Sequence, residues 1–92
     1  AQNWGLINKI VKETELMTEA WKMARLLVSG PPLVYAAIKE VVRDAENKKF
    51  QDVMNKITKR QYPTIDQLYS SEDQLEGAKA FAEKRDPIWK GY

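Results

Sequence analysis

The sequence predicts an all-α fold of about four helices after one short N-terminal strand. Apolar residues recur at helical spacing in separate segments between residues 15 and 85. Proline, glycine and serine separate these segments, as is typical of helix ends. Only residues 5–11 show the β-branched run of a strand. With 92 residues, the chain is long enough for a single unit with a thin core.

The predicted strand at residues 5–11 has no partner in the sequence. A single strand cannot satisfy its own backbone donors and acceptors, so it needs a neighbouring strand. No later segment has the pattern of a strand. We therefore expect the chain to be a fragment whose upstream structure is missing.

Two helices are predicted on either side of residues 29–32. Thr14 is the expected N-cap of the first helix, and Ser29-Gly30 is its expected end. Pro31 and Pro32 suit the first turn of the second helix, where a missing N–H is tolerated. The predicted buried stripes are Leu16, Ala20, Met23, Ala24 and Leu27, and then Leu33, Ala37, Ile38, Val41 and Val42.

A third and a fourth helix follow. The third has the stripe Phe50, Val53, Met54 and Ile57, and Pro63 should break or kink it, leaving residues 65–69 as a helical turn or irregular segment. The fourth begins at the capping box of residues 71–74 and stops at Asp86-Pro87. Its predicted inward stripe is Leu75, Ala78 and Ala82, with Phe81 at the edge.

Composition excludes several classes of function. The chain has no histidine and no cysteine, which excludes histidine-dependent catalysis, cysteine nucleophiles and thiolate metal sites. The net charge is +2 with charges of both signs interspersed, so no nucleic-acid partner is expected. No apolar run could span a membrane, and no signal peptide is recognisable. We expect no metal and a cytoplasmic location.

The side chains that could hold a ligand lie on one flank of the last helix. Gly77, Phe81 and Lys84 are spaced i−4 and i+3 about the aromatic residue. The ring could stack on a planar ligand, the glycine could permit close approach, and the lysine could contact a phosphate. The residues alone favour the other interpretation, in which Phe81 belongs to the core and Lys84 extends past it.

Other polar and aromatic residues are interpreted structurally. Carboxylates at 13, 15, 19, 72, 73 and 76 lie in first helical turns, where they stabilise the helix dipole, and we expect a solvated helix face. Trp4, Trp21 and Trp89 are expected to be packing residues, although Trp89 could also dock on another chain. No catalytic residue is predicted.

Three stretches carry a family resemblance when taken in order. They are Gly5-Leu6-Ile7-Asn8-Lys9-Ile10-Val11, then Ser29-Gly30-Pro31-Pro32-Leu33 leading to Ala37-Ile38-Lys39-Glu40, and then residues 71–85 with their Ala-Phe-Ala-Glu-Lys-Arg motif. Together they resemble the C-terminal third of the crotonase (enoyl-CoA hydratase/isomerase) family. The last of these stretches, with Asp86-Pro87-Ile88-Trp89-Lys90-Gly91 after it, is most similar to the carnitinyl-CoA dehydratase branch. The segment Gln61-Tyr62-Pro63-Thr64-Ile65 departs from the commoner hydratase pattern and agrees better with that branch.

The resemblance implies a function for the parent enzyme. Its strand would end a spiral catalytic domain, and its helices would form subunit contacts in a trimer or dimer of trimers. The catalytic groups would lie upstream, outside this chain. Phe81 and Lys84 match positions that approach the adenine and phosphate end of coenzyme A (CoA). An acyl-CoA thioester would be the substrate, with no tightly bound cofactor.

Two other hypotheses remain open at this point. The chain could be a free-standing helical protein–protein interaction domain without enzymatic activity. It could also be a separately encoded polypeptide that assembles with a catalytic partner.

Overall fold

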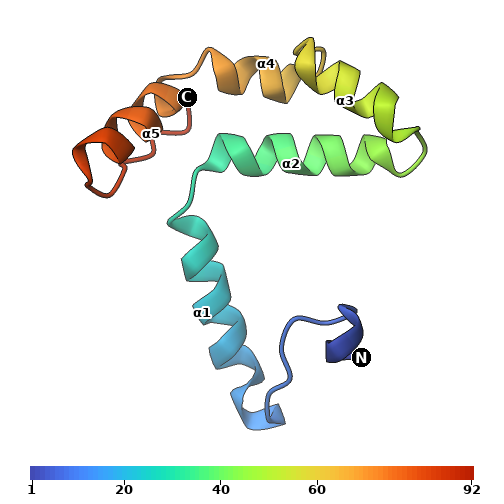
Figure 1. Cartoon of the computed structure of the whole chain (residues 1–92). Coiled ribbons are helices and arrows are strands. Elements are labelled where there is room, and N and C mark those ends of the chain that lie inside the picture. Colours follow the sequence, from blue (N-terminus) through green and yellow to red (C-terminus); the bar gives the residue numbers. More distant parts are fainter. The chain divides into compact units, whose positions relative to one another are not determined.

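The computed structural model describes all 92 residues and divides into two units, Ala1–Gly30 and Pro31–Tyr92. All regular structure is helical (Figure 1), so the all-α fold class is confirmed. No helix has the length and apolar character needed to cross a membrane. The two units are described separately below.

The predicted strand is not formed in the first unit. A 3-10 turn, η1 (Gln2–Trp4), is followed by a turn at Gly5 and an irregular segment up to Lys12. The prediction was wrong because a β-branched run becomes a strand only when another strand pairs with it, and this chain supplies none. The Thr14 cap was also wrong: Thr14 lies inside a second 3-10 turn, η2 (Glu13–Glu15), and no side chain caps the next helix.

Helix α1 (Leu16–Val28) ends where the sequence predicted. The Ser29 hydroxyl donates a hydrogen bond to the Leu26 carbonyl (2.6 Å), and the Gly30 amide donates to the Leu27 carbonyl (3.0 Å). These bonds satisfy carbonyls that the last turn of a helix leaves free. None of the α1 residues is buried, so its apolar stripe has no partner within the first unit.

The second unit contains α2 (Pro32–Ala45), α3 (Phe50–Thr58), α4 (Pro63–Tyr69) and α5 (Glu72–Glu83). Helices α3 and α4 both lie along α2 (Figure 1). The break at Pro63 is confirmed, and residues 63–69 form a complete helix, so the chain has five α-helices where about four were expected. Tyr62 has an extended backbone, as a residue before proline prefers, and this separates α4 from α3.

A small apolar cluster joins α2 to the two helices beside it. Ala37, Tyr62 and Ile65 are its buried members, and Val41, Ile57 and Leu68 pack against them. The predicted stripes are therefore correct in part. Ile38 and Val42 of α2 are exposed, as is Phe50 of α3, because the covered face of each helix is narrower than its apolar pattern.

Helix α5 starts at its predicted cap. The Gln74 amide donates to the Ser71 hydroxyl (3.2 Å), which is one half of the capping box. The other half is absent, because the Ser71 amide donates to the Leu68 carbonyl of α4 (3.2 Å) and needs no glutamine. The helix ends at Glu83, before Asp86-Pro87, because Lys84 adopts a left-handed conformation.

We predict that Ile65→Ala lowers the free energy of unfolding by about 2–5 kcal/mol, because it opens a cavity in the only cluster that joins α2 to α4. Leu75→Ala is the matched control. Leu75 is 73% exposed, so its truncation should change stability by no more than about 0.5 kcal/mol. Urea unfolding followed by circular dichroism measures both, and equal losses would contradict the proposed position of the core.

Candidate functional site

The predicted inward stripe of α5 is not buried in this chain. Leu75, Ala78 and Ala82 are all exposed, and the buried residues of the helix are Asp73 and Ala80. The predicted stripe was wrong because the spacing of apolar residues gives no information about which polar side chains will be covered by hydrogen-bonded contacts. Here the residues after the helix cover a face that carries two carboxylates.

The C-terminal tail (residues 86–92) returns along α5 and is bound at its far end by Asp73. The two carboxylate oxygens accept hydrogen bonds from the amides of Lys90 and Gly91, each at 2.8 Å. The Asp73 amide, a free donor in the first turn of α5, donates to the Tyr92 main-chain oxygen (3.0 Å). Asp73 is only 2% exposed, and a buried carboxylate is tolerated because these donors replace its water.

Glu76 binds the near end of the tail. Its two oxygens accept a forked pair of hydrogen bonds from the Arg85 guanidinium, at 2.5 and 3.2 Å. The Ile88 amide donates to one of the same oxygens at 3.0 Å. The Arg85 hydrogen bond first, and then the Ile88 amide, lower the pKa of Glu76 to about 2. Glu76 is therefore ionised, and bound to the tail, at neutral pH.

Trp89 lies against Gly77. Along the tail it falls between Ile88, which binds Glu76, and Lys90, which binds Asp73. A β-carbon at position 77 would stand 3.2 Å from the Trp89 ring atom Cη2, which is closer than normal packing allows. The missing side chain thus admits the indole. The interpretation of Trp89 as a packing residue is confirmed within the chain, whereas Trp4 and Trp21 are exposed.

Phe81 and Lys84 lie together at the other end of the helix. Phe81 is 88% exposed, so its interpretation as a core residue is wrong for this chain. The Lys84 amide donates to the Phe81 carbonyl (3.3 Å), and the following amide, of Arg85, donates to the Ala80 carbonyl (3.0 Å). These bonds close the helix around a residue in the left-handed conformation.

The backbone of Lys84 is strained. Its φ of 56° lies in the left-handed region, which costs a residue with a side chain about 1–2 kcal/mol and is usually filled by glycine. Arg60, at the end of α3, has a similar φ of 54°, but its guanidinium lies over the Tyr69 ring at 4.3 Å. Lys84 makes no such contact, and its ammonium has no ion pair or hydrogen bond in the chain.

The three predicted ligand residues are therefore divided between two surfaces. Phe81 and Lys84 share the exposed end of α5, whereas the space beside Gly77 is taken by Trp89. Sequence reasoning missed Asp73 and Glu76, which it assigned to a solvated face. That interpretation holds for the exposed Glu72. A usable signal was present: Asp86-Pro87 ends any helix, so the amides that follow need acceptors, and carboxylates at i and i+3 supply them.

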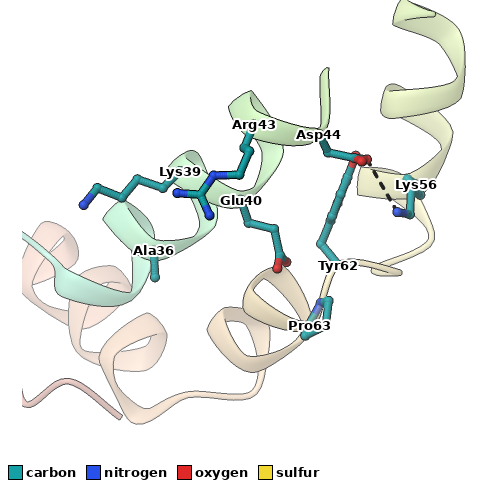
Figure 2. A pocket seen from close by; sticks show the side chains of 8 residues that line it. All are labelled: Ala36, Lys39, Glu40, Arg43, Asp44, Lys56, Tyr62 and Pro63. Carbon is teal, nitrogen blue, oxygen red and sulfur yellow. Dashed lines mark hydrogen bonds and ion pairs between the residues drawn. The ribbon is translucent and has the colours of Figure 1, made fainter. Parts of the chain in front are cut away.

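A polar groove of about 560 Å³ lies between α2 and the helices beside it (Figure 2). The Tyr62 hydroxyl donates to Asp44 (2.5 Å), and the Lys56 ammonium lies 3.5 Å from the same carboxylate. Its lining residues are Ala36, Lys39, Glu40, Arg43, Asp44, Lys56, Tyr62 and Pro63.

Both carboxylates of this groove serve the fold. Glu40 accepts hydrogen bonds from the Thr64 amide (3.2 Å) and hydroxyl (2.8 Å), at the start of α4. The Tyr62 hydroxyl, and then Lys48, lower the pKa of Asp44 to about 2, and the same hydrogen bond raises the pKa of Tyr62. A general acid or base near neutral pH needs a pKa close to 7, and the pKa values of Asp44 and Tyr62 are both shifted away from it.

Comparison with known proteins places these features in a family. The sequence matches the family described as enoyl-CoA hydratase/isomerase over residues 1–92. It is 42% identical to the carnitinyl-CoA dehydratases of Salmonella paratyphi A and Salmonella agona over 94 aligned positions. These alignments cover 99% of this chain and 35% of each relative, so the chain spans about a third of their length.

Solved structures agree with the sequence comparison. An enoyl-CoA hydratase/isomerase from Mycobacterium paratuberculosis matches with a TM-score of 0.85 at 27% identity, covering 100% of this chain and 35% of that one. An enoyl-CoA hydratase from Bacillus anthracis matches with a TM-score of 0.81 at 26% identity, covering 100% and 34%. The chain therefore belongs to the enoyl-CoA hydratase/isomerase family, and it corresponds to a C-terminal helical part of such proteins.

We predict that Gly77→Ala leaves overall stability nearly unchanged, because a gain of about 1 kcal/mol in helix propensity offsets a small displacement of the indole. Gly77→Val should displace Trp89, since a branched side chain cannot share that space. Fluorescence in a background with Trp4 and Trp21 replaced by phenylalanine reports on Trp89. A red shift is expected for the valine variant only, and a valine variant with unchanged emission would refute this packing.

Acid should release the tail. The pKa of Glu76 is about 2 in the folded chain, below its ordinary value of 4.5. Its contribution is thus complete above pH 4.5 and is lost as the pH falls toward 2. The Ile88 amide resonance, followed by NMR, should shift as the pH falls to about 2, where the folded carboxylate is protonated, and stay constant from pH 5 to pH 7. Glu76→Gln should abolish the step, and an unchanged step in that variant would assign it to another group.

Proposed function

We propose that this chain is the CoA-contacting and assembly part of an acyl-CoA hydratase or dehydratase. The observation that carries the proposal is the pairing of an exposed Phe81 with Lys84 at the end of α5. Family membership supports it, because the relatives' names describe enzymes of CoA thioesters.

The two side chains offer complementary chemistry. An exposed aromatic ring can stack on a purine, and each such stack is worth about 1–3 kcal/mol. The Lys84 ammonium has no partner within the chain, so it can form an ion pair with a phosphate. Gly77 contributes indirectly in this proposal: it admits Trp89, which anchors the tail beside the same helix.

No residue of this chain is proposed as catalytic. Asp73 and Glu76 hold the tail, while Glu40 and Asp44 hold α4 and Tyr62. We assign the acyl-CoA thioester as substrate to the parent enzyme, with its reacting carbonyl bound by groups outside this chain. No metal or tightly bound cofactor enters the proposal. A cytoplasmic location and a trimeric or dimer-of-trimers parent remain parts of it.

The exposed apolar residues support the assembly role. Helix α1 buries none of its residues, although its stripe includes Leu16, Met23 and Leu27. Large apolar side chains left exposed along one helix are typical of a surface that contacts other protein. The same observation favours the second candidate, a free-standing helical interaction domain without enzymatic activity. The two candidates differ in one measurable property, because only the first contacts CoA.

We predict that CoA binds the chain weakly, with a Kd on the order of 1 mM, because a one-sided contact leaves most of the ligand in water. Amide NMR titration should show shifts centred on Phe81 and Lys84. Phe81→Ala should weaken binding about fivefold or more, as lost stacking requires. Lys84→Gln should weaken it and reduce its dependence on salt.

Two controls make this titration specific. Leu75→Ala removes another exposed apolar side chain from the same helix and should leave CoA affinity unchanged. Pantetheine, which lacks the adenine and the phosphates, should cause no shifts. Equal shifts with pantetheine, or none at residues 81–84 with CoA, would overturn the CoA assignment and favour the interaction domain.

A further inference from the structure

We propose that Glu76 is a positioning residue for Lys84: through Arg85 it holds the left-handed turn that ends α5, so that Lys84 is presented beside Phe81 to a phosphate of bound CoA. This inference rests on the proposed function and extends it to residues that do not touch the ligand. Two observations carry it: the hydrogen bonds that Arg85 makes, and the backbone conformation of Lys84.

The turn is held in two ways by Arg85, the residue that follows Lys84. On the backbone, the Arg85 amide donates to the Ala80 carbonyl at 3.0 Å. Through the side chain, the Arg85 guanidinium binds both oxygens of Glu76 and one of Glu83. Glu76 also accepts a hydrogen bond from the Ile88 amide. Arg85 and the start of the tail therefore share one carboxylate. Between Glu83 and Arg85, whose side chains are bonded to each other, the Lys84 ammonium has no ion pair or hydrogen bond.

Lys84 also occupies a conformation that suits glycine better. Strained backbone of this kind persists where its surroundings impose it, and it concentrates at functional sites. Arg60 is the other non-glycine residue in this conformation. Both residues have a positive φ, but the Arg60 guanidinium packs over the Tyr69 ring, whereas the Lys84 ammonium has no hydrogen bond, ion pair or aromatic contact in the chain. A ligand phosphate would supply the missing partner.

If Glu76 acted only through its charge, its removal would have the opposite effect on CoA affinity from the loss of a positioning residue. Its carboxylate carries a negative charge near a proposed phosphate site, so removing that charge should by itself strengthen anion binding. If Glu76 instead holds the turn, removing the charge releases Arg85 and weakens binding. The sign of the change therefore separates a positioning role from a general effect of charge.

The test is a double-mutant cycle on CoA affinity, measured by amide NMR titration of the 92-residue chain. Glu76→Gln should weaken CoA binding about 3- to 30-fold, the range typical of residues that act through another. In a Lys84→Gln background, Glu76→Gln should cause no further loss, because the group it positions is gone. A purely structural role would give additive losses.

Two more variants keep the test decisive. Arg85→Lys keeps the net charge but cannot form the forked pair, so it should weaken CoA binding in the same direction even if Glu76→Gln fails to fold. Glu72→Gln removes the same charge from the same helix, where the carboxylate contacts only the exposed Lys90 ammonium, and it should leave affinity unchanged.

The outcomes are distinct. Unchanged or tighter binding by Glu76→Gln, or additive losses in the cycle, would overturn the positioning role while the CoA assignment stands. A wild-type chain that gives no shifts at residues 81–84 would instead overturn the proposed function, and the positioning role with it.

Discussion

The hydrogen bonds from the tail amides to Asp73 and Glu76 order the C-terminal end of the chain. Proline at position 87 prevents the helix from continuing, so the following amides must find acceptors elsewhere. Two carboxylates one turn apart on α5 supply them. The same arrangement brings Trp89 against Gly77, and Glu76, which accepts the Ile88 amide, also binds Arg85 beside the turn at Lys84. The candidate site thus depends on polar contacts more than on apolar packing.

The same use of carboxylates recurs in the rest of the second unit. Glu40 binds the first turn of α4, and Asp44 binds the hydroxyl of a buried tyrosine. In a chain this short, few apolar residues can be fully buried, so hydrogen bonds to carboxyl groups carry more of the specificity. This explains why a groove rich in charged residues serves the fold. It also leaves the end of α5, where Lys84 has no partner, as the better candidate for a ligand.

Family membership and local geometry bear on different parts of the function. The comparisons establish the family and show that the chain spans about a third of its relatives. The geometry supplies the candidate contact, an aromatic ring and a cation held at a defined turn. The exposed apolar residues on α1 are the observation behind the proposed assembly role. Catalysis is assigned to groups that this chain does not contain.

Local features of the sequence determined where most elements begin and end. Pro32 and Pro63 start helices, Ser29-Gly30 ends one and Ser71 caps another, because each acts through its own backbone or through neighbours within three residues. The sequence also predicted that Phe81 and Lys84 lie near one end of the last helix, because they are three residues apart. The strand failed because pairing is not local.

Only the tertiary structure decided which helix faces are covered and which polar groups are occupied. Apolar periodicity selected Leu75 as inward-facing, yet the tail covers Asp73 and Gly77, on a different face. That choice depends on amides some 17 residues further along the chain, which a 3.6-residue period cannot encode. For the same reason the sequence could not show that the tail would cover Gly77 with Trp89 while leaving Phe81 and Lys84 exposed.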